Sequence, residues 1–148
     1  MTDEVSALRA EVIEKTISVE WLIHAIISQH YFGQVRIGFV SEVLYDEYCS
    51  FALKRRIVLK VCPTLQGETE QQLNRLNTIR NFFAHVGQSV VDGPDPNGPP
   101  RIPSPRDFSK AVDFSALYKE FLSIEGPLVK ALFAAYEQKG GVSVASAT

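Results

Sequence analysis

Residues 3–30 read DEVSALRAEVIEKTISVEWLIHAIISQH, and apolar side chains recur through this stretch at spacings of three, four and five. The apolar positions are Val5, Leu8, Val12, Ile13, Ile17, Leu22, Ile23 and Ile26. These spacings place the apolar residues on one face of an α-helix. The stretch therefore predicts a long amphipathic helix over 3–30 that ends at Gly33.

Three further helices are expected between Gly33 and Gly87. Helical patterns run over 39–48 and 51–62, and Pro63 ends the second because proline disfavours helical geometry in the residue before it. The next helix begins near Glu68, whose charge suits the positive end of the helix dipole, and ends at Gly87.

Residues 88–112 form a segment rich in proline and glycine, where the helical pattern stops. Ser89–Val91 and Arg101–Ile102 lie on either side of a turn signal at Asp92–Gly93, so we expect these two segments to form a short two-stranded ribbon. A connection this long inside a compact domain is normally either functional or disordered. We expect its part from Val91 to Pro105 to lie at the rim of a functional site.

The helical pattern returns from Asp113, and Gly126–Pro127 predict a kink or a split within it. The long segments show no useful strand alternation. We therefore predict an all-α fold, an antiparallel bundle of four to five helices with one long Pro-rich loop. The length of 148 residues suits one domain over 1–139, followed by a flexible tail over 140–148.

Composition excludes several classes of protein. Hydrophobic residues make up 45% and charged residues 22%, and the net charge of -2 argues against a globally basic nucleic-acid-binding surface, although a local basic patch remains open. Cys49 and Cys62 lack metal-binding spacing, which favours reduced thiols and a cytoplasmic location. We expect neither a signal peptide nor a membrane partner, because the apolar stretch over 21–27 is too short to span a bilayer.

Common nucleotide-binding and catalytic motifs are absent from the sequence. It contains no GxxxxGK[ST], GxGxxG, GxSxG or HExxH motif. The three histidines, His24, His30 and His85, are too scattered to suggest a metal site. We therefore expect no cofactor and no metal.

Residues 73–88, LNRLNTIRNFFAHVGQ, separate sharply into two faces on a helical wheel. The apolar face holds Leu73, Leu76, Ile79, Phe82, Phe83 and Val86, and the polar face holds Asn74, Asn77, Thr78, Asn81, His85 and Gln88. An exposed helix face normally carries lysine and glutamate, yet Arg80 is the only charged residue between Leu76 and Gln88. This composition suits a helix face that is partly buried against a polar surface.

Arg80 and His85 are the candidate reactive residues of this helix. Arg80 falls at the edge of the apolar face, so it needs a carboxylate partner or an anionic ligand, or must extend its stem to solvent. If that pair is fully buried, Arg80→Ala should cost roughly 3 to 5 kcal/mol. His85 lies in the last turn, where the helix dipole favours the imidazolium, so it is a usable acid or base.

The order Arg80-Asn81-Phe82-Phe83-Ala84-His85 resembles the hallmark of the HEPN superfamily, an arginine, a polar residue and a histidine near the end of a helix. The spacing here is Arg-x4-His. The resemblance extends across the order of the expected helices, over about residues 1–139. Within the superfamily, the segment IRNFFAH is most similar to the mannitol-repressor-like branch.

This resemblance implies a metal-independent endoribonuclease, formed where two motif helices meet across a two-fold homodimer. His85 would transfer protons at the ribose 2′-hydroxyl or the leaving 5′-oxygen, and Arg80 would bind the phosphate. Asn81 would orient the imidazole or bind a phosphate oxygen. The implied partners are a second copy of the chain, RNA, and a cognate antitoxin or a regulatory protein.

Other interpretations of the same residues stay open. Arg80 could pair with Glu20, Glu42 or Asp46 while His85 caps the helix, in a non-catalytic dimeric module that regulates transcription or binds protein. We expect His24 to be a core or interface histidine. The basic cluster Lys54, Arg55, Arg56 and Lys60 suits a solvated helix face better than an RNA contact.

Overall fold

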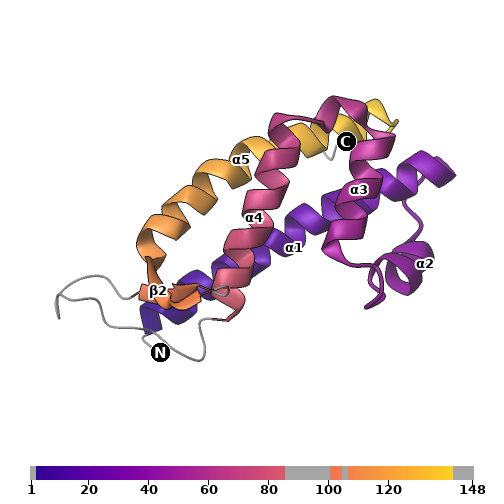
Figure 1. Ribbon diagram of the computed structural model, residues 1–148. Coiled ribbons are helices and arrows are strands. Elements are labelled where there is room, and N and C mark those ends of the chain that lie inside the picture. The colour runs from indigo at the N-terminus through magenta and orange to yellow at the C-terminus, as the bar shows by residue number, and fades with distance from the viewer. Residues whose placement is uncertain (1–2, 86–100, 105–106, 142–148) are drawn as a thin grey trace. The chain divides into compact units, whose positions relative to one another are not determined.

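The computed structural model describes residues 3–85, 101–104 and 107–141. Their α-helices are α1 (Asp3–Phe32), α2 (Ile37–Phe39), α3 (Phe51–Val61), α4 (Glu68–Ala84) and α5 (Phe114–Gln138), as Figure 1 shows. A π-helical turn, η1 (Val40–Leu44), follows α2, and a 3-10 turn, η2 (Pro63–Leu65), follows α3. The prediction of an all-α fold of four to five helices is confirmed.

The ends of the helices follow local signals in the sequence. Gly33 ends α1 with a φ of 69°, in the left-handed region that suits glycine, and its N–H donates to the carbonyl of Gln29 at 2.9 Å. Pro63 follows α3 closely, as expected. The helix expected over 39–48 begins earlier, at Ile37, and changes to the wider π-helical turn before it ends at Leu44.

A short antiparallel ribbon lies between α4 and α5. Strand β1 (Arg101–Ser104) pairs with β2 (Asp107–Asp113), with Arg101 opposite Asp113. The expected strand at Arg101–Ile102 is therefore present, but its partner is β2, which is close in sequence and can pair through a tight connection. Ser89–Val91, the expected partner, and most of the proposed rim from Val91 to Pro105 lie outside the described residues.

The chain divides into two compact units, and α1, α4 and α5 each contribute to both. Unit 1 comprises residues 1–17 and 74–125, and unit 2 comprises residues 18–73 and 126–148. The prediction of one domain over 1–139 stays a prediction. No helix in the described part of the chain is long and apolar enough to cross a membrane.

Unit 1 has a core built from α1, α4 and α5. Its buried side chains are Val5, Val12, Leu76, Ile79, Phe83, Phe114, Leu117 and Phe121. Arg75 on α4 donates hydrogen bonds to both carboxylate oxygens of Glu120 on α5. The distance from Nε to Oε1 is 2.5 Å, and the distance from Nη2 to Oε2 is 2.8 Å. These hydrogen bonds lower the pKa of Glu120, but both side chains are half-exposed, so the pair contributes little to stability.

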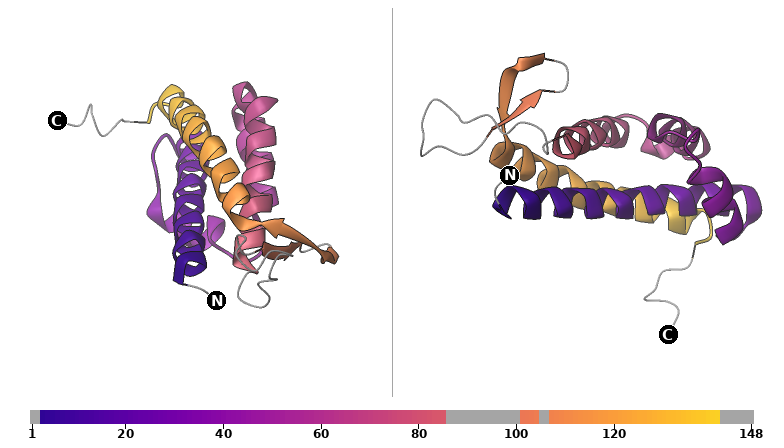
Figure 2. Two further views of the ribbon diagram at one scale, coloured as in Figure 1. Left: turned by 90° about the vertical axis from the view of Figure 1, so that its left-hand side faces the viewer. Right: turned by 90° about the horizontal axis from the view of Figure 1, so that it is seen from below.

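Unit 2 packs the second halves of α1 and α5 with α3 and the start of α4. Its largest fully buried side chains are Ile23, Ile26, Ile27, Leu44, Leu73 and Leu128. Lys139 Nζ, just after α5, lies 2.9 Å from Nδ1 of His30 near the end of α1. The carboxyl ends of the two helices therefore meet, and this pair runs in the same direction rather than antiparallel (Figure 2).

The helix expected to kink or split at Gly126–Pro127 is not split. α5 runs as one helix from Phe114 to Gln138, with Pro127 inside it. Proline removes one backbone hydrogen bond. Buried side chains on both sides of it, Phe121 in unit 1 and Leu128 in unit 2, anchor the flanking turns.

Removal of the N-cap of α3 tests the local basis of this fold. The Ser50 hydroxyl accepts the Leu53 N–H at 3.2 Å. We expect Ser50→Ala to lower the free energy of unfolding by about 1 kcal/mol, because one N-terminal donor loses its acceptor. Urea unfolding followed by circular dichroism measures the change, and Ser50→Asp, which keeps an acceptor, should stay close to the unsubstituted protein.

Candidate functional site

The candidate residues Arg80, Asn81 and His85 lie at the carboxyl end of α4, in unit 1. Arg80 and Asn81 belong to the last turns of the helix, and His85 follows its final residue. The His85 N–H lies 3.3 Å from the carbonyls of both Asn81 and Phe82 and still continues the helical hydrogen bonding. The helix thus presents all three side chains within about one and a half turns.

Arg80 and His85 are exposed, and Asn81 is partly exposed. Arg80 Nη1 donates to Oδ1 of Asn81 at 3.1 Å, so the guanidinium and the amide form a linked pair. Within the described part of the chain, Arg80 has no carboxylate partner. Its guanidinium is exposed to solvent.

Of the alternatives left open for Arg80, the structure shows the stem extended to solvent rather than a buried pair with an acidic side chain. Glu20, one of the three proposed partners, instead accepts a hydrogen bond from Lys54 at 2.6 Å. Asp46 accepts the backbone N–H of Tyr48 at 2.9 Å, and Glu42 is exposed.

The physical reason is the position of Arg80 on the helix wheel. Leu76, Ile79 and Phe83 take the core positions of α4, and Arg80 lies beside them at the edge. There its long stem carries the guanidinium outward to solvent. The loss of roughly 3 to 5 kcal/mol predicted for Arg80→Ala depended on a buried pair and is no longer expected.

The polar face of α4 is mostly exposed in the single chain, and its expected burial against a polar surface stays a prediction. Asn74, Thr78 and His85 are exposed, and Asn77 is partly exposed. Thr78 Oγ1 donates to the carbonyl of Asn74 at 3.0 Å and is used within the helix. Val86 and Gln88, also assigned to the two faces, lie outside the described residues.

These groups can transfer a proton and bind an anion without a metal. An accessible imidazole can give or take a proton, and a guanidinium binds phosphate oxygens through its fork of N–H donors. Among the residues that the structure describes, no three His, Cys, Asp or Glu side chains are placed to hold a metal ion.

A second polar cluster, which the sequence analysis did not predict, lies inside unit 2. Lys54 on α3 is only 4% exposed, and its Nζ lies 2.6 Å from Oε1 of Glu20 on α1. His24 is completely buried one turn further along α1, with Nε2 3.9 Å from the same carboxylate oxygen. Its ring also meets the edge of Tyr45, with 4.6 Å between the ring centroids.

His24 is a neutral imidazole in this environment. Its pKa is lowered to about 4, chiefly by burial and secondly by the Lys54 ammonium group, while the Glu20 carboxylate opposes the change. Neither ring nitrogen has a hydrogen-bond partner among the described residues. The pKa of Tyr45 is raised, first by burial and then by Glu20.

The position of Lys54 relative to the apolar residues of its helix indicates that its side chain is buried. Lys54, Val58 and Val61 stand at i, i+4 and i+7, so they share one helical face, and all three are buried. Arg56 and Lys60 are exposed, as expected for a solvated face, and Arg55 is partly exposed. The assignment of Lys54 to that solvated face is wrong, because Glu20 draws its ammonium group into the core.

The two clusters differ in their access to solvent. Glu20, His24 and Lys54 are largely withdrawn from it, whereas Arg80 and His85 are open to a dissolved substrate. No known family model, curated protein or solved structure matches the chain. The exposed cluster at the end of α4 is therefore selected as the candidate site on its chemistry and accessibility alone.

The buried imidazole of His24 should make stability depend on pH. The unfolded chain binds a proton at His24 below about pH 6.5, whereas the folded protein resists protonation until about pH 4, so acid favours unfolding across this window. We expect the free energy of unfolding to fall by about 2 kcal/mol between pH 7 and pH 5 from this group. Urea titrations at each pH measure it.

Two substitutions assign that pH dependence to one residue. His24→Leu removes the titrating group and should flatten the change between pH 7 and pH 5. His30→Leu removes an exposed histidine and should leave the change in place. An equal pH dependence in the His24→Leu protein would show that another group is responsible.

Proposed function

We propose that this protein is a metal-independent endoribonuclease of the HEPN type, acting in the cytoplasm through Arg80, Asn81 and His85. The observation that supports the proposal is the exposure of Arg80 without a carboxylate partner in the described part of the chain. A purely structural arginine would be expected to pair with an acid. An exposed guanidinium and an exposed imidazole at the same end of one helix suit a phosphodiester substrate instead.

The proposed reaction is transfer of the phosphoryl group to the neighbouring 2′-oxygen. An imidazole removes the proton of the ribose 2′-hydroxyl, the 2′-oxygen attacks phosphorus, and the bond from phosphorus to the 5′-oxygen breaks. A protonated imidazole gives a proton to the leaving 5′-oxygen. Arg80 stabilises the charge that develops on the phosphate oxygens, and Asn81 positions the guanidinium through their hydrogen bond.

The proposed site is complete only in a homodimer. The reaction needs a base and an acid at once, and His85 is the single histidine of the motif in each chain. A two-fold axis beside the end of α4 would supply a second imidazole and a second guanidinium. The exposed polar face around Asn77 and His85 suits such a contact, because uncharged hydrogen-bonding groups can pair across an interface.

A non-catalytic dimeric module, mannitol-repressor-like and regulatory or protein-binding, is the second candidate function. The observation that favours it is the small amount of basic surface for an RNA backbone. The chain carries a net charge of -2, and Lys54, part of its densest basic cluster, is buried against Glu20. In that module the Arg-x4-His motif would serve the dimer contact alone.

Cleavage in the presence of EDTA tests the enzymatic proposal. We expect the purified protein to cut single-stranded RNA without a divalent metal and to leave a 2′,3′-cyclic phosphate, identified by mass spectrometry of the products. His85→Ala should lower the rate by at least about 100-fold, because proton transfer is lost. Asn81→Ala should lower it by a smaller factor.

Controls separate loss of chemistry from loss of fold. Arg80 and His85 are exposed, so Arg80→Ala and His85→Ala should each change the free energy of unfolding by less than about 0.5 kcal/mol. His30→Ala, at an exposed histidine in unit 2, should cleave normally. A requirement for Mg²⁺, or full activity in the His85→Ala protein, would favour the binding module.

Light scattering tests the proposed homodimer. At micromolar concentration we expect the mass of two chains, because one chain of 16.5 kDa contributes only half of the site. Mixing His85→Ala chains with unsubstituted chains should lower cleavage further than dilution alone, because a mixed dimer keeps only one of the two imidazoles that the reaction needs. A monomeric mass would contradict the dimer.

A further inference from the structure

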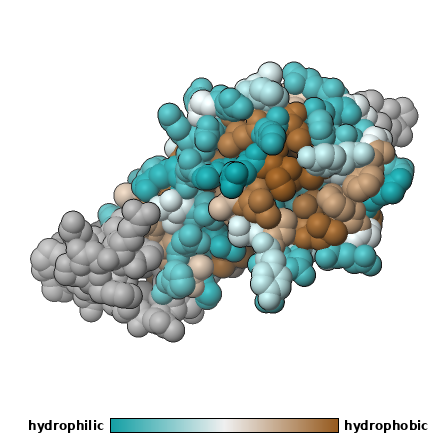
Figure 3. All heavy atoms as spheres, turned by 45° about the vertical axis from the view of Figure 1, so that its right-hand side comes forward, coloured by the Kyte–Doolittle hydropathy of each residue, from teal (hydrophilic) through white to brown (hydrophobic). Residues whose placement is uncertain are grey.

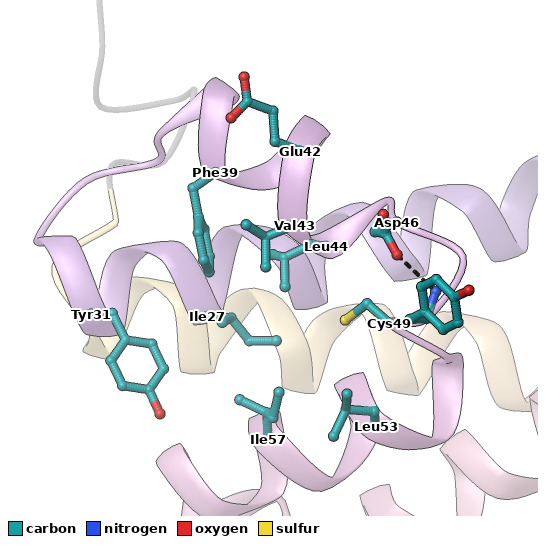
Figure 4. Close-up of a pocket in the computed structure, with 11 residues that line it drawn as sticks. Ile27, Tyr31, Phe39, Glu42, Val43, Leu44, Asp46, Cys49, Leu53 and Ile57 are labelled. Atoms are coloured by element: carbon teal, nitrogen blue, oxygen red, sulfur yellow. Dashed lines mark hydrogen bonds between the residues drawn. The ribbon is translucent and has the colours of Figure 1, made fainter.

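Unit 2 contains a hydrophobic groove that is separate from the proposed cleavage residues. Its cavity of about 410 Å³ lies between α1, the η1 turn and α3. The apolar residues that line it include Ile27, Phe39, Val43, Leu44, Leu53 and Ile57. Figure 4 shows the side chains of Ile27, Val43 and Ile57 converging on one space from these three elements.

The hydrophobic surface extends beyond the cavity. Tyr31 is 60% exposed, Val43 is 48% exposed and Tyr48 is 85% exposed, although all three line the groove. Figure 3 shows hydrophobic side chains gathered on a face of the molecule with hydrophilic ones around them. A small ligand would be enclosed by its pocket. Apolar side chains that stand open beside the cavity suit a larger partner that covers them.

The charged side chains that line the groove are acidic. Glu42 and Asp46 line the groove, and the exposed Glu47 follows them. Residues 37–53 contain these three acidic side chains and no lysine or arginine. In Figure 4 the Glu42 carboxylate points away from the apolar space, at the edge where a partner's charges would lie. The groove is therefore complementary to an apolar surface bordered by basic residues.

We propose that this groove binds the apolar face of a basic amphipathic helix from another protein. Such a helix presents large apolar side chains at i, i+3 or i+4 and i+7, which can enter a groove between helices, and its flanking lysines or arginines can reach Glu42 and Asp46. A second copy of this chain fits less well. A two-fold contact through the groove would bring two sets of the same acidic residues together.

Model peptides test this proposal without RNA or the cleavage residues. One peptide is a helix with leucines on one face and lysines on the other, and a matched peptide has glutamates in place of the lysines. We expect the lysine peptide to bind at least about tenfold more tightly in fluorescence anisotropy at low salt. Glu42→Lys together with Glu47→Lys should remove most of that difference.

Substitutions at the groove test the apolar contact. Val43→Ser and Tyr48→Ser should each weaken binding of the lysine peptide about tenfold, and their exposure makes normal folding the expected result, checked by circular dichroism. Two matched controls lie outside the groove. Ile17→Ser alters an apolar side chain that is 51% exposed in unit 1, and Glu137→Lys alters an exposed acid in unit 2, and both should leave binding unchanged.

Three results would overturn the proposal. The first is equal binding of the lysine and glutamate peptides. The second is an equal loss of binding in the control variants and in the groove variants. The third is a dimer that Val43→Ser separates into monomers, since the groove would then be covered by a second copy. None of these results depends on whether the protein cleaves RNA.

Discussion

The contact between Lys54 and Glu20 is the interaction on which the arrangement of unit 2 depends. It joins α3 to α1 across 2.6 Å, and it does so with an ammonium group that is almost completely withdrawn from water. A buried charge is costly unless a partner of opposite charge is held in place, so the pair permits few relative positions of the two helices. The two helices that the pair joins, α1 and α3, also form two walls of the hydrophobic groove.

Two aromatic rings, Tyr45 and His24, pack around the Lys54–Glu20 pair. Lys54 Nζ lies 5.4 Å from the centre of the Tyr45 ring, so the ammonium group gains a contact with an aromatic face as well as with the carboxylate. His24 packs against the edge of the same ring and remains neutral, because burial and the nearby ammonium group both lower its pKa. The cluster thus holds one positive charge, one negative charge and one uncharged imidazole.

The two surfaces proposed to act on other molecules place their polar groups differently. At the end of α4, Arg80 is exposed and shares a hydrogen bond with Asn81, so a substrate can reach its charge. At the groove, the apolar side chains are the binding surface and the acidic residues border them. The first surface is proposed to bind a phosphodiester, and the second is proposed to bind a basic helix.

Much of the fold could be predicted because helix formation is governed by nearby residues. The spacing of apolar residues located α1, α3, α4 and α5 closely, and Gly33 and Pro63 marked ends of two of them. The same local pattern placed Asn74 and Thr78 on the polar face of α4, and both side chains are exposed there. The π-helical turn at Val40–Leu44 was missed, since it has the same apolar spacing as a short α-helix over a few residues.

The sequence by itself therefore determined the helices, the polar face of α4 and the set of residues able to carry chemistry. Only the tertiary structure decided which charges are buried and which remain free. Lys54 and Arg80 each lie near the apolar face of a helix, yet Glu20 pairs with Lys54 while Arg80 reaches solvent. Periodicity within one helix cannot distinguish these outcomes, because the partner of a charged side chain lies on a different helix. Its position depends on how the helices pack.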